Sequence, residues 1–346
     1  MYLDAMHNSL RTFSRREALG LAVGAGVGAT SATPAATLNL QDPRDNVYAW
    51  CKTWGTLGDA AVYGGHEGVF FAVVEDKRAI PLVGYVGFGS LQFKLLNNGD
   101  ALYRGKDATY YTDLKTGEIL DVWDNPFTGE QCPVYPYVND RVRTTMLQDY
   151  PAERFATDAY RWEITIGNAT SSREQAKTYR GDIGQSGRTK PFVLPWRRRG
   201  DYYLLSWDWM LEVVNPVTPE GWPLSSTGPT INPSEHFVFF VPAAELEDRS
   251  RPAATMLAGF FRQTPWLPWM KMGQTGIEGR LFANSHSYKT AGGLDNIPRV
   301  VRERLERDRP DMLEAPDDWE PGPIGSTWSY YASVVPPENP EYEVKK

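Results

Sequence analysis

The sequence of 346 residues has a formal net charge of −7, and 41% of its residues are hydrophobic. This composition excludes a disordered chain and is sufficient for one large or two ordinary domains. The acidic residues are dispersed and no basic stripe is present, which disfavours binding to nucleic acid. Aromatic residues make up 13% of the chain, and 31 glycines and 26 prolines interrupt its aromatic and β-branched runs, a pattern typical of a β-rich protein.

The N-terminus has the features of a removable export signal. Arg15 and Arg16 belong to a stretch that resembles the twin-arginine motif, although Ala18 replaces its usual bulky residue. The apolar stretch at 18–32 consists mostly of small residues and is too short to span a bilayer. We therefore expect residues 1–36 to be a signal peptide and the mature protein to be periplasmic, without stable membrane insertion. The alternative, an internal apolar helix, is disfavoured by the glycines.

A helix is expected over 42–54, near the start of the mature chain. Asp42 followed by Pro43 is typical of a helix N-terminus, and Val47 and Trp50 lie near helical spacing. The pattern therefore predicts a helix ahead of the first strand.

Most of the remaining chain is expected to form short strands. The expected strands are 67–79, 81–96, 101–114, 119–125, 132–138, 161–167, 201–214, 235–242, 256–263 and 279–288. Turn signals recur between them, which is typical of an antiparallel meander. Such a meander closes into a lipocalin-like barrel or a strongly curved sheet, here with a few peripheral helices. Gly84, Gly87 and Gly89 should mark bends or close approaches of the backbone.

The C-terminal part is expected to contain one helix and a tail. The segment 295–308 has a helix start and a stripe that includes Val301 and Leu305. Residues 315–346 are rich in proline and acidic residues and should be extended. Residues 37–314 are then a single β-rich domain.

Four segments of the chain resemble one bacterial family. They are YRGKDATYYTDLKTGEILDVWDNPFTGE at 103–130, EHFVFF at 235–240, PWLPWMKMG at 265–273 and PDMLEAPDDW at 310–319. Together they resemble the family labelled DUF1838 over most of the mature chain. The resemblance implies a single β-rich fold and agrees with a twin-arginine leader and a domain without a cofactor. It implies no particular chemistry.

The segment 265–273 combines two prolines with Trp266 and Trp269. Prolines at this spacing prevent a regular helix or a central strand. In polyproline II geometry three residues make one turn, so the two indole rings should face the same side. We expect them to line either a pocket or a seam against the C-terminal helix.

The common catalytic and cofactor signatures are absent from the sequence. It contains no G-x-S-x-G motif, no P-loop and no G-x-G-x-x-G motif that opens a helix. Its histidines and its two cysteines, Cys51 and Cys132, do not have metal-ligand spacing, so we expect neither a metal nor another cofactor. The sequence does not determine whether the two cysteines are bonded.

The catalytic candidates are His236, Glu235 and Arg143. His236 lies at the mouth of an apolar strand and would act as the base, while Arg143 would hold an oxyanion. Adjacent side chains of a strand point to opposite faces, so Glu235 and His236 can share a pocket only across a bulge. The alternative for His236 is a core or rim histidine bonded to the backbone. His66 follows a glycine pair and is interpreted as a surface histidine in a turn.

Aromatic residues on the expected strands are the candidates for substrate binding. The predicted substrate-binding residues are Tyr110, Trp123, Trp207, Trp209, Trp266, Trp269 and His286. Aromatic walls with a few polar groups form apolar pockets. The alternative is an aromatic core with no pocket, and for His286 a surface position on a hairpin.

Two functional hypotheses remain. The first is a cofactor-independent lyase or isomerase that acts by acid–base chemistry on a small apolar, aromatic or terpenoid-like molecule. The second is a non-catalytic, lipocalin-like periplasmic protein that binds such a molecule. Export in a folded state fits the first hypothesis slightly better.

Overall fold

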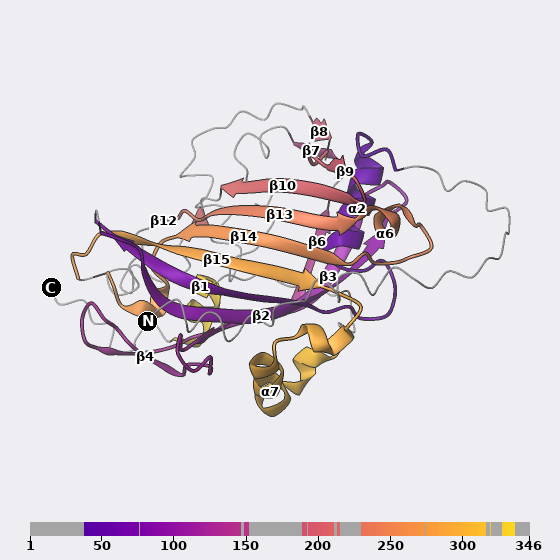
Figure 1. Cartoon of the computed structure of the whole chain (residues 1–346). Helices are drawn as coiled ribbons and strands as arrows, with labels where there is room; N and C mark the ends of the chain where they lie inside the picture. The colour runs from indigo at the N-terminus through magenta and orange to yellow at the C-terminus, as the bar shows by residue number, and fades with distance from the viewer. Residues whose placement is uncertain are drawn as a thin grey trace, which may run out of the picture. The chain divides into compact units, whose positions relative to one another are not determined.

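The computed structural model describes residues 38–75, 77–146, 149–151, 189–191, 193–210, 213–214, 230–273, 275–315, 319 and 327–335 (Figure 1). The expected signal peptide and the expected strand at 161–167 lie outside these residues. For Arg143 and Trp209 the structure describes the backbone only.

Nine strands form one antiparallel sheet, in the order β6-β3-β2-β1-β15-β14-β13-β10-β9. Their bounds are β1 (Gly64–Val74), β2 (Ile80–Leu95), β3 (Ala101–Thr112), β6 (Tyr137–Met146), β9 (Arg197–Arg199), β10 (Tyr202–Met210), β13 (Ser234–Pro242), β14 (Met256–Thr264) and β15 (Gly279–Lys289). Three further pairs are β4 (Val122–Asp124) with β5 (Gln131–Pro133), β7 (Asp149–Pro151) with β8 (Thr189–Pro191), and β11 (Val213–Val214) with β12 (Thr230–Ile231). The expectation of a mainly β, antiparallel fold is confirmed.

The sheet is not one continuous meander. β1, β2 and β3 follow one another outward in one direction, and β13, β14 and β15 follow one another inward from the other. β1 and β15 pair at the centre, from Gly65↔Tyr288 to Val74↔Gly279 (Figure 1). The two halves of the chain are therefore joined by the pairing of strands that are about 200 residues apart, a contact with a high loop-closure cost.

The first strand begins earlier than expected. We interpreted Gly64 and Gly65 as a turn, and this interpretation is wrong, because both residues lie in β1. A Cβ atom at Gly65 would lie 2.1 Å from the carbonyl oxygen of Asn296. Glycine is required here by a close tertiary contact rather than by a turn. His66 is therefore a strand residue and not a turn residue at the surface.

Two hydrophobic clusters occupy the face of the sheet that we call the inner face. The first, the α2 cluster, forms around the helix α2 (Pro43–Trp54). The side chain of Asp42 accepts a hydrogen bond from the backbone N–H of Arg44 at 2.9 Å, so the predicted helix start is confirmed. Trp50 packs edge-on against Trp207 of β10, with ring centroids 4.5 Å apart.

The second cluster on the inner face, the η2 cluster, forms around the 3₁₀ turn η2 (Pro268–Met270). Its members include Phe70, Tyr85, Tyr111, Trp123, Trp266, Trp269, Trp328 and Tyr331. Trp328 and Tyr331 belong to the helix α8 (Thr327–Val334) and are each only 1% exposed. The prediction of an extended tail is thus wrong for this segment, because burial of two large aromatic side chains stabilises a helix on the core.

The segment around η2 corrects the expected polyproline geometry. Leu267 is extended, but the N–H of Met270 donates to the carbonyl of Leu267 at 3.0 Å and closes a 3₁₀ turn. Lys271 then adopts a left-handed conformation with φ 53°. Trp266 and Trp269 share one cluster, yet they contact different rings.

The opposite, outer face of the sheet carries the remaining cluster. The helix α7 (Arg299–Asp308) buries Val301 and Leu305 completely against this face, which confirms the predicted stripe. The 3₁₀ turns η3 (Gly293–Asn296) and η4 (Pro310–Leu313) precede and follow α7, and the short helix α6 (Ala243–Glu247) follows β13. Among the described residues, none of the helices is both long enough and apolar enough to cross a membrane.

Candidate functional site

A band of polar side chains crosses the inner face between the α2 cluster and the η2 cluster. Along β15 the inward residues change from Leu281 and Ala283, which belong to the η2 cluster, to Ser285 and Ser287. Neighbouring strands show the same change, and besides Ser287 the strand register places six polar residues on this part of the face. We call them the polar band: His66, Tyr85, Thr109, Glu235, Arg262 and Ser285.

His66 lies deep in the sheet and is neutral. Its Nε2 atom is 3.0 Å from the hydroxyl oxygen of Thr109. The imidazole covers Gly87, where a Cβ atom would lie 2.3 Å from Nε2, so the expected close approach at this glycine is confirmed. Burial lowers the pKa of His66 to about 4. The residue as a whole is nevertheless only half-buried.

Tyr85 is the second aromatic member of the polar band. Its ring lies across Gly68, where a Cβ atom would be 2.8 Å from Cε1, and its centroid is 5.9 Å from that of His66. Burial raises the pKa of Tyr85, while Ser285 and the charge of Arg262 oppose this rise in part. Tyr85 is thus a neutral phenol, and apart from each other the hydroxyls of Tyr85 and Ser285 have no hydrogen-bond partner among the described residues.

Glu235 and Arg262 form the charged end of the polar band. They are directly opposite on β13 and β14, and the guanidinium Nη1 atom lies 3.5 Å from the carboxylate Oε1. Glu235 is 8% exposed and Arg262 is 23% exposed, so solvent screens this pair only in part. The buried Nε atom of Arg262 and the hydroxyl of the next inward residue, Thr264, have no hydrogen-bond partner in the described structure.

The predicted catalytic residues lie apart. β13 pairs with β10 and β14 without a register shift, so Glu235 and His236 point to opposite faces of the sheet. Glu235 belongs to the polar band, whereas His236 lies on the outer face, opposite Phe261 of β14. The backbone of Arg143 pairs with Arg104 in β6 and β3. Catalytic roles for these residues stay predictions.

The predicted substrate-binding residues are distributed over three clusters. Trp207 belongs to the α2 cluster, and Trp123, Trp266 and Trp269 belong to the η2 cluster. Trp123 and Trp269 meet edge-on at 5.6 Å, whereas Trp266 contacts Phe127 at 5.4 Å.

The other predicted substrate-binding residues lie elsewhere. Tyr110 is buried under α7 on the outer face. His286 is exposed on the outer face, where its ring stacks with Tyr288 at 6.1 Å. The backbone of Trp209 lies opposite Glu235. Tyr110 and His286 are therefore not brought to the inner face.

Sequence reasoning missed most of the polar band. His66 was assigned to the surface because the preceding glycine pair was interpreted as a turn. Tyr85, Arg262 and Ser285 lie in strands whose other residues are mostly apolar. One signal was present: Gly87 makes room for a ring on the neighbouring strand. The identity of that ring follows only from the register of β1 and β2.

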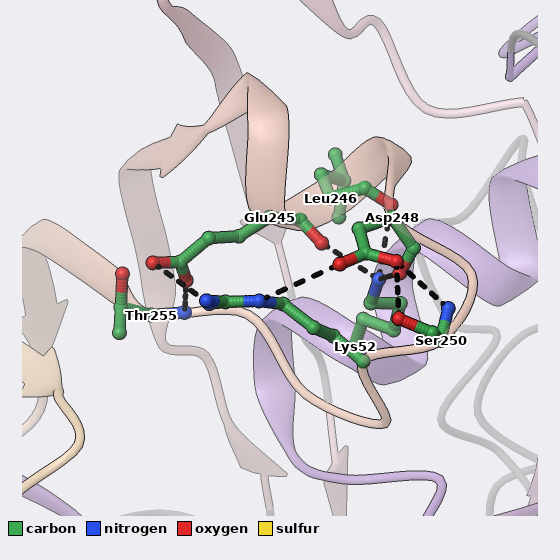
Figure 2. Close-up of polar contacts among 7 residues, drawn as sticks. Lys52, Glu245, Leu246, Asp248, Ser250 and Thr255 are labelled. Carbon is green, nitrogen blue, oxygen red and sulfur yellow. Dashed lines mark hydrogen bonds and ion pairs between the residues drawn. The ribbon is translucent and has the colours of Figure 1, made fainter. Parts of the chain in front are cut away.

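A second buried polar cluster surrounds Lys52 (Figure 2). The ammonium group of Lys52 donates to the carbonyl oxygens of Glu245 at 2.7 Å, Leu246 at 3.1 Å and Asp248 at 2.6 Å, at the end of α6. Lys289 donates to the carbonyls of Lys52 and Gly55 at 2.8 Å and 2.7 Å, at the end of α2. We call these two residues the lysine cluster.

The lysine cluster has a structural role. Burial lowers the pKa of Lys289 to about 7 and the pKa of Lys52 to about 8. Both amino groups donate to carbonyls at helix ends, which otherwise lack intrahelical partners. This arrangement holds α2, α6 and β15 together.

In the described part of the chain there is neither a disulfide nor a cluster of possible metal ligands. Cys51 and Cys132 form no disulfide, and they are buried in different clusters, the α2 cluster and the η2 cluster. Within the described ranges no group of three or more His, Cys, Asp or Glu side chains is placed to hold a metal ion.

The chain belongs to the family described as "Protein of unknown function (DUF1838)", whose model matches residues 60–335. The search of curated proteins finds no match. Among solved structures, a mutant of the Rh. blastica porin matches with 8% identity and a TM-score of 0.18, covering 67% of this chain and 100% of that chain. The outer membrane protein OmpT of Vibrio cholerae matches with the same identity and TM-score and covers 67% of this chain and 99% of that chain. Similarity at this level supports no inference about function.

Proposed function

We propose that the polar band binds a small molecule that combines an apolar body with a polar group. The observation that carries this proposal is a group of buried donors and acceptors that lack hydrogen-bond partners among the described residues. They are the Nε atom of Arg262 and the hydroxyls of Tyr85, Ser285 and Thr264, of which only Tyr85 and Ser285 bond each other. A buried polar group without a partner costs about 1–3 kcal/mol. Such groups gathered on one face are typical of a site that a ligand or ordered water completes.

Phe260 supports the apolar part of the proposal. It is half-buried, lies directly opposite Ser285 and packs against both the α2 cluster and the η2 cluster. Its ring centroid is 4.6 Å from that of Phe237. A ligand on the polar band would therefore find an aromatic surface beside its polar contacts, which is the usual composition of a small-molecule site.

We further propose that the sheet curves around this face, as in a lipocalin-like fold. The segment that ends α2 touches strands that are far apart in the sheet. Thr56 forms a parallel bridge with Gln92 of β2, while Trp50 packs against Trp207 of β10. Four strands separate β2 from β10 in the strand order, and a flat sheet would keep them about 25 Å apart. Contact of both strands with one helical segment favours curvature.

Binding can be tested with the neutral fluorescent probe N-phenylnaphthylamine. We expect one high-affinity site and an affinity reduced about tenfold in Ser285→Val, which removes the inward hydroxyl and places two methyl groups opposite Phe260. The matched control is Ser206→Val, because Ser206 is exposed on the outer face of β10. Equal affinities of the two variants would contradict a site on the polar band, and the absence of saturable binding would contradict the function itself. Native mass spectrometry of protein from its natural host would identify a co-purified ligand.

The second candidate function is acid–base catalysis of the lyase or isomerase type. The proximity of His66 to Tyr85 favours it, because a neutral imidazole can accept a proton and a neutral phenol can donate one. The test compares His66→Gln with His236→Ala on a panel of aromatic and terpenoid compounds. Loss of turnover with retained probe binding in His66→Gln would support catalysis at the polar band. The same loss in His236→Ala alone would assign the base to the outer face, and no turnover in the unmodified protein would leave binding as the function.

We also propose that the twin-arginine-like segment directs export. Fusion of residues 1–36 to a reporter that is active only after export should give activity that depends on the twin-arginine translocase. Replacement of Arg15 and Arg16 by lysine should abolish it. A reporter that remains active after this double replacement would contradict the proposal.

A further inference from the structure

The ion pair between Arg262 and Glu235 does not satisfy all the N–H donors of Arg262. A charge-assisted hydrogen bond between a guanidinium and a carboxylate is usually about 2.7–2.9 Å long. The closest approach of Arg262 to Glu235 is 3.5 Å, and the Nε–H group of Arg262 is buried without a partner among the described residues. Arginine carries five N–H donors and no acceptor. The guanidinium therefore has donor capacity that only an additional oxygen or nitrogen acceptor can satisfy.

The neighbours of Arg262 also offer donors. Tyr85 is close enough for the charge of Arg262 to lower the pKa of its phenol, although burial raises that pKa overall. The hydroxyls of Tyr85 and Ser285 can each donate one hydrogen bond, and Ser285 lies opposite Phe260, the inward neighbour of Arg262 on β14. The donors thus lie on the same face, on β2, β14 and β15, beside an aromatic ring.

We infer that the ligand of the polar band is an apolar carboxylate or a similar organic anion. Its anionic oxygens accept hydrogen bonds from Arg262, Tyr85 and Ser285, and its apolar body lies on Phe260. This inference rests on the proposed binding function and specifies its ligand class. Glu235 opposes the anion by charge and at the same time orients the guanidinium through the ion pair.

The experiment uses two probes that differ by one charged group. Anilinonaphthalene sulfonate carries a sulfonate that stands in for the carboxylate, and N-phenylnaphthylamine has the same ring system without it. In titrations of the full mature chain, Arg262→Met should weaken binding of the sulfonate about tenfold or more and change binding of the neutral probe less than about twofold. Glu235→Gln should strengthen binding of the sulfonate, because it removes the competing negative charge.

The matched control is Arg280→Met. Arg280 is exposed on the outer face of β15, and its loss should leave both affinities unchanged. Each variant is first checked by its cooperative thermal unfolding. If Arg262→Met does not fold, Arg262→Lys replaces it, and the loss of the planar fork should still weaken binding of the sulfonate selectively.

The outcomes separate the two proposals. If Arg262→Met affects the binding of both probes equally, or of neither, the anion inference is overturned. Saturable binding of the neutral probe in the same experiment would still support the proposed function. A sulfonate affinity that falls as much in Arg280→Met as in Arg262→Met also overturns the inference, because it places the anion on the outer face. Absence of saturable binding by both probes overturns both proposals.

Discussion

The lysine cluster and the polar band are both buried polar regions, yet their hydrogen bonding differs. In the lysine cluster, Lys52 donates to three carbonyls and Lys289 to two, all between 2.6 Å and 3.1 Å. In the polar band and beside it, the Nε atom of Arg262 and the hydroxyl of Thr264 have no partner within the described part of the chain. The contact between Arg262 and Glu235 is 3.5 Å long.

The difference separates a structural site from a candidate binding site. A buried charge that is held by several short hydrogen bonds to backbone carbonyls contributes to the fold and has little capacity left for a ligand. A buried group with free donors destabilises the empty protein and becomes favourable only when an acceptor arrives. The first region should therefore respond to substitution mainly in stability, and the second mainly in ligand affinity.

The largest effect on stability is expected for Lys52→Met. The substitution leaves the carbonyls of Glu245, Leu246 and Asp248 buried without their donor and should lower the free energy of unfolding by about 4 kcal/mol. Urea unfolding measures it. The control is Lys77→Met, since Lys77 is exposed, and it should change stability by less than about 0.5 kcal/mol. Similar small effects of both variants would show that the lysine cluster does not stabilise the fold.

The second largest effect on stability is expected for Gly87→Ala, which tests whether the ring of His66 packs on the backbone of β2. The new Cβ atom would lie 2.2 Å from the carbonyl oxygen of Ala108 and 2.3 Å from Nε2 of His66, at a cost of about 3 kcal/mol. Gly259→Ala is the matched control, because a Cβ atom there meets no atom within 4 Å. Equal melting temperatures of the two variants would contradict the position of the His66 ring.

The third prediction concerns the loss of stability at acidic pH. The pKa of His66 is lowered from 6.5 to about 4, so between these pH values the unfolded state binds more protons than the folded state. Stability is therefore fully present above pH 6.5 and is lost as the pH falls towards 4, by about 3 kcal/mol. Urea unfolding of His66→Gln should lack this loss, whereas His286→Gln, the control on the outer face, should keep it. An NMR titration that finds an unshifted His66 would show that water hydrates the ring freely.

The smallest effect compares two buried threonines. Thr53 donates its hydroxyl to the carbonyl of Ala49 at 2.8 Å, whereas the hydroxyl of Thr264 has no partner among the residues that the structure describes. Thr53→Val should cost about 1 kcal/mol, while Thr264→Val should be neutral or stabilising by up to about 1 kcal/mol. Thermal unfolding measures both. A clear loss of stability in Thr264→Val would mean that its hydroxyl is bonded in solution and would remove the contrast between the two regions.

Local features of the fold were predictable. The cap of α2 at Asp42 and the stripe of Val301 and Leu305 depend on residues within one or two helical turns. The strands β2 and β3 also match their predicted segments closely, because alternation and turn residues act over short distances.

The candidate site was much less predictable. Of the polar band, only Glu235 was named from the sequence as a site residue, and it was paired with a neighbour that lies on the other face. The misreading of Gly64 and Gly65 had a physical cause. A glycine pair suits a tight turn and a crowded strand equally well, and only the carbonyl of Asn296 distinguishes them here.

The sequence by itself determined the β-rich class, the family, the first helix and the helix that ends at Asp308. Tertiary structure alone decided that β1 pairs with β15, that Trp328 and Tyr331 fold back onto the core, and that His66 and Arg262 share one face. The physical reason is the range of the interactions. Propensity, capping and alternation act between near neighbours, whereas strand pairing joins residues about 200 positions apart and is selected by the burial of the whole inner face.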